Sequence, residues 1–210
     1  MLDRVVHVVR GNVDRQADPV RGKLFDLRRH KAIEPDRYRA GVDVEDAIRR
    51  RRTHKQYGPE PVDDAIVREL VDLARQAPNH KLTNPWRFRV LGPETRRRIE
   101  ELADEKEAVK LRRAPTLVLA TAIRSDDPAL AEEDVLATAC AVYALLLGAT
   151  ARGLASYWRT PRVFHEVAVR DALGLAAGED VVALIHLGDP VSDPPVKERA
   201  PVDDVLVVLP

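Results

Sequence analysis

The stretch Ala77-Pro78-Asn79-His80-Lys81-Leu82-Thr83-Asn84-Pro85-Trp86-Arg87-Phe88 places polar side chains between two prolines. A helical pattern ends before Pro78, and a strand pattern begins at Trp86. Loops at such junctions commonly carry binding residues. A second polar cluster, Arg51-Arg52-Thr53-His54-Lys55, lies about two dozen residues upstream and offers the donors that an anionic ligand needs.

Composition limits the class of protein. The chain has 210 residues, enough for one domain with a sizeable core, and its 34 cationic side chains balance 34 anionic ones. Neutral overall charge gives no reason to expect a nucleic acid or an anionic membrane as partner. The single cysteine, Cys140, excludes an intramolecular disulfide and a cysteine-based zinc site. We therefore expect a cytoplasmic protein.

Residues 1–42 are charged, lack sustained periodicity and are interpreted as an N-terminal extension of unknown role. Charged residues interrupt the apolar residues of Val5–Val9, so this segment lacks the continuous apolar run of a secretory signal. We expect it to form a short strand instead. Residues 43–210 are interpreted as one domain. The apolar run 137–151 is shorter than a membrane helix needs and is expected to be a buried core helix.

The periodicity of the domain predicts alternating helices and strands. A helix capped by Asp43 runs into the arginine cluster, and a second begins near Asp63 with Ile66, Leu70 and Leu73 on its apolar face. The remaining expected elements are strand 86–91, a helix from Pro93, strand 116–123 at the centre of the sheet, the helix at 137–151, strand 154–158, a short helix at 165–173, strand 181–187 and strand 205–209.

Several common site chemistries lack their motifs. No glycine-rich dinucleotide fingerprint, phosphate-binding loop or nucleophile elbow occurs in the chain. The six histidines have no metal-ligand spacing, so no metal site is expected. Cys140 lies in an apolar helical pattern and is expected to pack in the core.

Each polar cluster has a structural alternative. The run Arg49–Arg52 could be a solvated basic face at the end of a helix, His80 could be a structural histidine, and Trp86 could be a core residue. The presence of both clusters in one domain favours a ligand site.

The pair of clusters resembles the nitroreductase family of FMN-dependent oxidoreductases, and in particular its small single-domain subgroup. The resemblance rests on five segments in order, over residues 43–210: Arg51-Arg52-Thr53, Ala77-Pro78 through Pro85-Trp86, Thr138-Ala139-Cys140-Ala141 through Gly153-Leu154, Leu187 through Pro190, and Lys197-Glu198-Arg199-Ala200-Pro201. It implies an α+β nitroreductase-like fold, a central mostly antiparallel sheet flanked by helices, and an intertwined homodimer with FMN at its interface.

The resemblance also implies roles for particular residues. Arg51, Arg52, Thr53, Lys197 and Arg199 would bind the phosphate of FMN, for which arginine forks and hydroxyls are suitable donors. Lys55 and Asn84 would contact the polar edge of the flavin ring. The other implied contacts are Trp158, Arg159 and Thr160 beside the ring and His80, the one catalytic candidate, reaching FMN across the dimer interface.

The implied activity transfers electrons from NADH or NADPH through FMN to a nitroaromatic, a quinone or a similar acceptor by a ping-pong mechanism. Two departures from the family pattern, Gln76 and Leu82, leave contacts at those positions open. One alternative keeps the fold but makes the protein an FMN store, a sensor or a flavin-modifying relative. Another takes Arg49–Arg52 as a nucleic-acid footprint, which the neutral chain does not favour.

Overall fold

The computed structural model describes residues 42–210, which lie within a single unit of the chain. The prediction of a strand at Val5–Val9 lies outside the described residues. The elements, in order, are α1 (Val44–Arg50), α2 (Asp64–Ala74), η1 (His80–Leu82), β1 (Trp86–Val90), α3 (Pro93–Leu102), α4 (Glu105–Leu111), β2 (Thr116–Ile123), α5 (Pro128–Ala151), β3 (Ala155–Arg159), η2 (Arg162–His165), α6 (Val167–Leu173), β4 (Glu179–Gly188) and η3 (Val202–Asp204).

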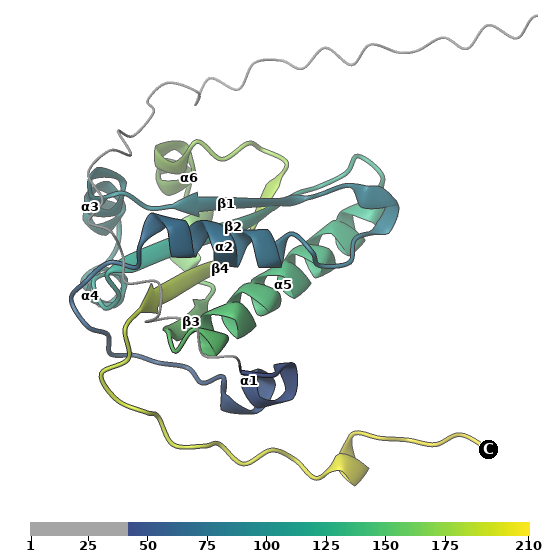
Figure 1. Cartoon of the computed structure of the whole chain (residues 1–210). Helices are drawn as coiled ribbons and strands as arrows, with labels where there is room; N and C mark the ends of the chain where they lie inside the picture. Colours follow the sequence, from purple (N-terminus) through teal and green to yellow (C-terminus); the bar gives the residue numbers. More distant parts are fainter. Residues whose placement is uncertain (1–41) are drawn as a thin grey trace, which may run out of the picture. The chain divides into compact units, whose positions relative to one another are not determined.

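Four antiparallel strands form the sheet, in the spatial order β1-β2-β4-β3 (Figure 1). β2 is an inner strand, as its apolar sequence predicts, and it pairs with β1 on one side and β4 on the other. β3 is an edge strand, so its outer backbone groups are open to another segment. The predicted α+β fold with a central antiparallel sheet is therefore confirmed.

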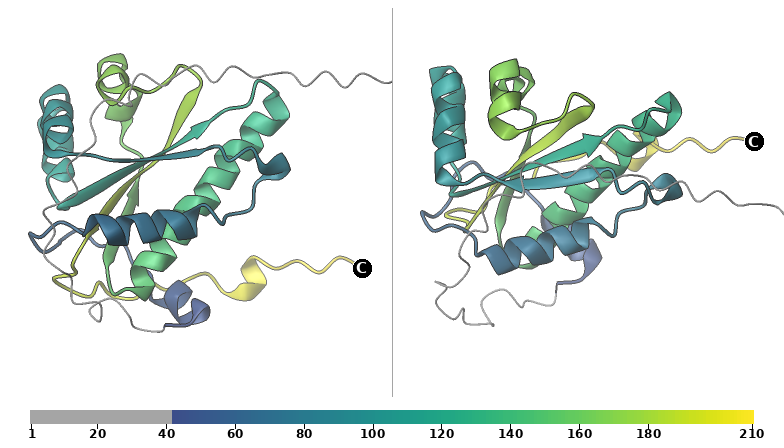
Figure 2. Two further views of the ribbon diagram at one scale, coloured as in Figure 1. Left: turned by 45° about the horizontal axis from the view of Figure 1, so that its top comes forward. Right: turned by 90° about the horizontal axis from the view of Figure 1, so that it is seen from above.

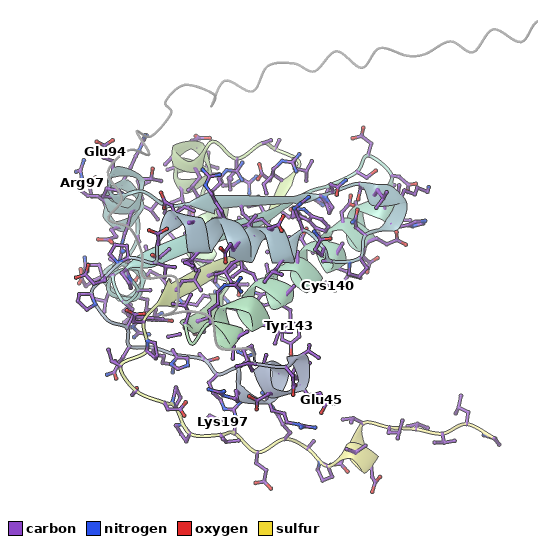
Figure 3. All side chains as sticks on the ribbon, viewed as in Figure 1. Glu45, Glu94, Arg97, Cys140, Tyr143 and Lys197 are labelled. Carbon is purple, nitrogen blue, oxygen red and sulfur yellow. The ribbon has the colours of Figure 1, made fainter. Side chains whose placement is uncertain are left out.

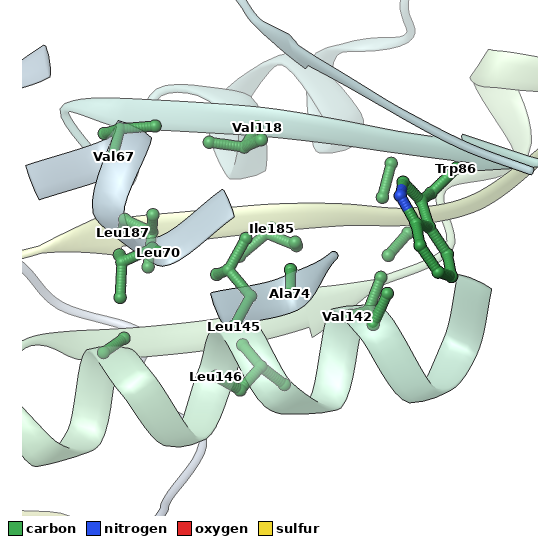
Figure 4. Close-up of a cluster of buried hydrophobic side chains, with 14 of the residues drawn as sticks. Val67, Leu70, Ala74, Trp86, Val118, Val142, Leu145, Leu146, Ile185 and Leu187 are labelled. Carbon is green, nitrogen blue, oxygen red and sulfur yellow. The ribbon is translucent and has the colours of Figure 1, made fainter. Parts of the chain in front are cut away.

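Helices cover both faces of the sheet (Figure 2). Alternate residues of β2 face opposite sides: Val118, Ala120 and Ala122 join a core with α2 and α5, whereas Leu117 and Leu119 join a second core with α3, α4 and α6. Figure 4 shows the first core, in which side chains of α2 and α5 meet those of β2 and β4. Burial of apolar surface on both faces, at about 25 cal/mol per Å², stabilises the sheet.

α5 is the longest helix and begins earlier than the apolar run predicts. Pro128 occupies its first turn, and the carboxylate of Asp127 caps it by accepting a hydrogen bond from the Ala129 amide at 3.0 Å. Among the described helices α5 alone is long and apolar enough to cross a membrane, although half of its apolar window is buried within this unit. Gly148 lets α2 approach closely, because a Cβ there would lie 2.8 Å from Leu73 Cδ1.

Two packing predictions are wrong in detail. Leu73 is 41 % exposed, and the buried face of α2 is completed by Val67 instead. Cys140 is exposed on the outer side of α5, so it does not pack in the core of the single chain. Leu136 and Tyr143 share that exposed stripe (Figure 3 labels Cys140 and Tyr143).

The C-terminal segment does not form the predicted strand in the single chain. Val205 closes η3, residues 206–209 have no regular secondary structure, and all five are exposed and unpaired with the described strands. The chain leaves the sheet at Pro190, which bridges Tyr57, and the tail that follows does not return to either edge strand, β1 or β3. α4, which the sequence analysis does not predict, forms from the charged run after its N-cap Asp104.

Candidate functional site

The cationic segment 51–55 lies along the free edge of β3. Thr53 forms a parallel β-bridge with Ser156, and the His54 amide donates a hydrogen bond to the Ser156 carbonyl at 3.0 Å. Further along, the Gly58 amide donates to the Asp189 carbonyl at 2.9 Å. The segment that follows α1 is therefore held between the start of β3 and the end of β4.

Glycine at the end of β4 makes this approach possible. A Cβ on Gly188 would lie 2.9 Å from Pro115 Cδ, closer than side chains tolerate, and at a tight 3.2 Å from Tyr57 Cβ. A substitution at Gly188 would therefore require Pro115 to shift and would crowd Tyr57, which follows the cationic cluster.

Side chains of the extended segment alternate in direction. Arg52 and His54 line a cavity of about 500 Å³ together with the tail residues Pro190–Pro194 and Val196. Arg52 Nη1 donates to the Arg51 carbonyl at 2.9 Å and also contacts the Arg49 carbonyl. Arg51, Thr53 and Lys55 are absent from the lining of that cavity.

The cationic side chains proposed to hold an anion are available. Within residues 42–210, no ion pair or side-chain hydrogen bond engages Arg51, Lys55, Lys197 or Arg199. Lys197 and Arg199 are exposed on the tail that follows the cavity-lining Val196 (Figure 3 labels Lys197). Arg51 and Lys55 lie on the segment beside β3, and Lys197 and Arg199 lie on the tail; unpaired guanidinium and ammonium groups of this kind are suitable donors for a phosphate.

Trp158 and Arg159 lie on opposite faces of β3. The Trp158 indole packs against the first core, and its Nε1 donates to the Val182 carbonyl at 3.2 Å. Arg159 is 9 % exposed, and its Nη2 donates to Glu107 Oε2 at 2.7 Å. Thr160 is exposed in the loop that follows. The Arg159 side chain is thus engaged in an ion pair with Glu107 of α4. It is not free to contact a ligand beside this loop.

The pKa values of Glu107 and His54 both lie below their usual values, for different reasons. Desolvation opposes ionisation of Glu107, but hydrogen bonds from Lys110 and Arg159 outweigh it and hold the Glu107 pKa below its usual range. Desolvation also lowers the pKa of His54, against the opposing charge of Asp193. His54 is therefore a neutral group beside the cationic segment at neutral pH.

Buried polar atoms without partners cluster around β3. In the described part of the chain these are His54 Nδ1, Ser156 Oγ, Arg159 Nη1 and both ring nitrogens of His186. The His186 ring lies 5.7 Å from the Tyr157 ring, centroid to centroid, beside the same strand. Sequence reasoning included His54 in the polar cluster but did not predict its burial, and it missed Ser156 and His186, because burial of a polar residue depends on strand pairing that no local pattern reveals.

The second predicted cluster lies in a different place. η1 packs against the first half of α5, where His80 Nδ1 lies 2.6 Å from Glu133 Oε2. The Asn84 amide donates to Asn79 Oδ1 at 2.9 Å, and Asn84 Nδ2 donates to the Leu82 carbonyl at 2.7 Å. His80 and Asn84 are both exposed.

Within one chain the two clusters cannot form one pocket. Thr150, which lines the cavity beside Arg52 and His54, is seventeen residues from Glu133 on the same helix. At 1.5 Å per residue the two positions are separated by roughly 26 Å along α5. The structure therefore brings residues 51–55, the tail and the loop after β3 to one edge, and places His80 and Asn84 elsewhere.

Loop 79–84 also depends on a residue that sequence reasoning missed. Asp134 is 3 % exposed, and its Oδ1 accepts a hydrogen bond from Thr83 Oγ1 at 2.6 Å. Asp134 is the last of three consecutive acidic residues, Glu132 to Asp134, so no local signal distinguishes the buried carboxylate from its exposed neighbours. No group of three or more His, Cys, Asp or Glu residues suited to a metal ion occurs in residues 42–210.

Known sequence families and proteins match most of residues 43–210. The nitroreductase family, as a sequence family, matches residues 48–110 and 102–189. The Bacillus subtilis protein YfhC, named as an NAD(P)H nitroreductase, is 29 % identical over 177 residues, which cover 77 % of this chain and 91 % of YfhC. The Escherichia coli protein YdjA, named in the same way, is 27 % identical over 157 residues, covering 68 % of this chain and 85 % of YdjA.

Solved structures share the fold. A nitroreductase-like protein from Bacillus cereus superposes with a TM-score of 0.73 at 21 % identity, covering 81 % of this chain and 97 % of that one. A Desulfovibrio desulfuricans nitroreductase solved in complex with FMN superposes with a TM-score of 0.68 at 25 % identity, covering 81 % of this chain and 99 % of that one. Because the family matches residues 48–189, more than half of the chain, and the solved structures share its fold, this chain belongs to the nitroreductase family.

Proposed function

We propose that this protein is an FMN-dependent oxidoreductase. It takes electrons from NADH or NADPH and passes them to a nitroaromatic, a quinone or a similar electron-poor acceptor. The proposal is supported by family membership, by relatives named as NAD(P)H nitroreductases and by the FMN complex of a structural neighbour. A nitroreductase described as dependent on FMN and NADPH also shares the fold, with a TM-score of 0.67.

The observation that carries the proposal is the cationic segment on the edge of β3. The bridge between Thr53 and Ser156 presents a row of donors beside a strand whose outer edge is otherwise open. Arg51, Thr53, Lys197 and Arg199 would bind the phosphate, because each charged donor lacks a partner among the described residues. Arg52 would contribute general charge, since its guanidinium is turned toward backbone carbonyls.

The ring would lie next to the loop after β3. Lys55 would place a cation near the pyrimidine edge of the ring, where it would favour added negative charge. The backbone of Trp158–Thr160 would lie beside the ring, because the Trp158 and Arg159 side chains are engaged by Val182 and Glu107.

We propose a homodimer in which each FMN site draws on two chains. Since roughly 26 Å of α5 separates the clusters in one chain, His80 and Asn84 would reach the site of the partner. The exposed apolar side chains Leu136 and Tyr143 on α5, and Val44 on α1, provide surface for such a dimer. An apolar stripe of this kind on a soluble chain usually marks an interface.

The chain's residues position the reactants. Bound FMN would supply the redox chemistry, and the protein's residues would orient the ring and balance its charge. A reduced nicotinamide and an electron-poor acceptor would occupy the same open face in turn, which is a ping-pong scheme. His80 is the side chain best placed to touch a substrate, because it is exposed and its ring is oriented by Glu133.

Anaerobic reduction tests the activity. The protein loaded with FMN is expected to lose its oxidised-flavin absorbance on addition of NADH or NADPH and to regain it on addition of a nitroaromatic or a quinone. A loaded protein that neither nicotinamide reduces, or that no such acceptor reoxidises, would instead be an FMN store or sensor.

A further inference from the structure

Two adjacent carboxylates of α5 hold loop 79–84. Glu133 Oε2 lies 2.6 Å from His80 Nδ1, and Asp134 Oδ1 accepts a hydrogen bond from Thr83 Oγ1 at 2.6 Å. Asp134 Oδ2 also accepts from the Ser125 amide at 3.0 Å. Glu133 is half-exposed, whereas Asp134 is buried in the first turns of a helix that is otherwise apolar on that side.

The loop needs an external restraint. Lys81, Leu82 and Asn84 all have left-handed backbone conformations, with φ of 53°, 53° and 48°. For non-glycine residues this conformation costs about 1–2 kcal/mol each, and it persists where surrounding contacts determine it. Asn tolerates it more readily than Lys or Leu. The side chains of Lys81 and Leu82 are exposed, and that of Lys81 makes no hydrogen bond within residues 42–210 that could hold this conformation.

The side chains at the two ends of the loop have different anchors. His80 is held from outside by Glu133, and because a carboxylate is only an acceptor, the proton of that bond belongs to His80 Nδ1. Nε2 is then the ring nitrogen left for a ligand. Asn84 is held within the loop by Asn79 Oδ1 and the Leu82 carbonyl, and the hydrogen bond of the preceding Thr83 to Asp134 attaches this part of the loop to α5.

We propose that Asp134 is a positioning residue for the FMN site of the partner chain. By holding Thr83 it keeps the loop in its left-handed form, with His80 and Asn84 presented away from their own chain. Glu133 fixes the His80 ring in the same way, and the two contacts, Asp134 with Thr83 and Glu133 with His80, are called the clamp below. The inference rests on the proposed function, since it assumes that the loop serves an FMN site.

Thr83 gives the sharpest variant, because it breaks the clamp without touching α5. Thr83→Val removes the hydroxyl while Asp134 keeps its bond to the Ser125 amide. Thr83→Ser restores the hydroxyl and is the rescue variant. Glu132→Gln is the matched control, since Glu132 is an exposed neighbour with no ion pair among the described residues.

FMN affinity measured by flavin fluorescence is expected to fall about tenfold in Thr83→Val, as one charge-assisted bond is lost, and to return in Thr83→Ser. Glu132→Gln is expected to match the parent chain. A Thr83→Val protein that melts at a lower temperature but binds FMN with parental affinity and keeps its kcat and KM would overturn the proposal. Asp134 would then stabilise only its own fold.

A mixed dimer separates positioning in the partner from damage within a chain. One chain carries Thr83→Val and the other Arg51→Ala, with different purification tags. One of the two sites then combines an intact cationic segment with an intact loop, so the mixed dimer is expected to bind one FMN with parental affinity. Equal weakening at both sites would contradict the inference. If the parent chain binds no FMN at all, the proposed function fails independently of the clamp.

Discussion

Thr53 and Ser156 lie side by side in a parallel β-bridge. This pairing attaches the segment after α1 to the free edge of β3, although the two residues are far apart in sequence. Because side chains alternate along the segment, the pairing places Arg52 and His54 in the lining of the cavity and turns Arg51, Thr53 and Lys55 to the other side. Substitutions of single arginines are therefore expected to differ in effect.

The first prediction concerns anion binding. Arg51→Ala or Arg199→Ala is expected to weaken FMN binding by about 1.5–3 kcal/mol, or roughly tenfold to a hundredfold, because each removes a charge-assisted donor. Arg50→Ala is the control, since Arg50 Nη1 pairs with Asp46 Oδ2 at 3.2 Å on the exposed side of α1. Titration of FMN into the stripped protein measures all three. Equal losses would mean that only the general charge matters.

The second prediction concerns His80. His80→Ala is expected to lower kcat or raise KM for the acceptor while changing the melting temperature little, because a hydrogen bond to the half-exposed Glu133 contributes about 1 kcal/mol or less. Steady-state kinetics and thermal unfolding of the FMN-loaded variant measure the two effects. Full activity together with a clearly lower melting temperature would assign His80 a structural role.

The third prediction concerns the C-terminal tail. The C-terminal strand, Val205–Leu209, is expected to be exchanged onto the partner chain of an obligate dimer, so truncation after Pro201 is expected to loosen the dimer and to weaken FMN binding together, although Lys197 and Arg199 remain. Five apolar residues, 205–209, are exposed in the single chain, and an extended apolar segment of this kind pairs with an edge or a partner surface. Light scattering and flavin titration check both effects. A truncated chain that stays dimeric with normal FMN affinity would show that the tail is not exchanged.

The fourth prediction concerns pH. Burial, reinforced by the Arg159, Arg96 and Arg113 guanidinium groups, lowers the pKa of His186 from 6.5 to about 3. Below pH 6.5 the unfolded chain binds a proton that the folded chain does not, so stability falls as the pH decreases toward 3, by up to about 1.4 kcal/mol per pH unit. Above pH 6.5 the ring is neutral in both states and the effect vanishes.

Removal of the imidazole tests this linkage. Between about pH 7.5 and about pH 5, the parent chain is expected to lose roughly 2 kcal/mol more stability than His186→Gln. His54 and the carboxylates titrate in both proteins and cancel in the comparison. Urea unfolding at the two pH values measures the difference. Parallel losses in the two proteins would mean that His186 is solvated or hydrogen-bonded in the folded chain.

The sequence predicted the parts of the fold that depend on local pattern. β2 and α5 followed from apolar runs, and the caps Asp43 and Asp63 from the preference of carboxylates for helix N-termini. α4 was missed because its charged sequence gives little apolar periodicity. The strand at 205–209 was predicted from composition alone, and a strand forms only where an edge is available.

The candidate site was predictable in its residue types but not in its geometry. The resemblance supplied Arg51 and Thr53, yet only pairing with Ser156 shows that they share an edge with β3. The separation of His80 from that edge depends on the length and direction of α5. The role of Asp134 depends on a contact with Thr83 across 51 positions of sequence, which no local pattern encodes.

The flavin content of the purified protein tests the central claim most directly. The protein is expected to be yellow, or to become so on reconstitution, and to release FMN on denaturation, identified by chromatography against FMN and FAD standards. One FMN per chain is the predicted stoichiometry. Release of FAD, or the absence of any bound flavin after reconstitution, would contradict the assignment of the β3 edge as an FMN site.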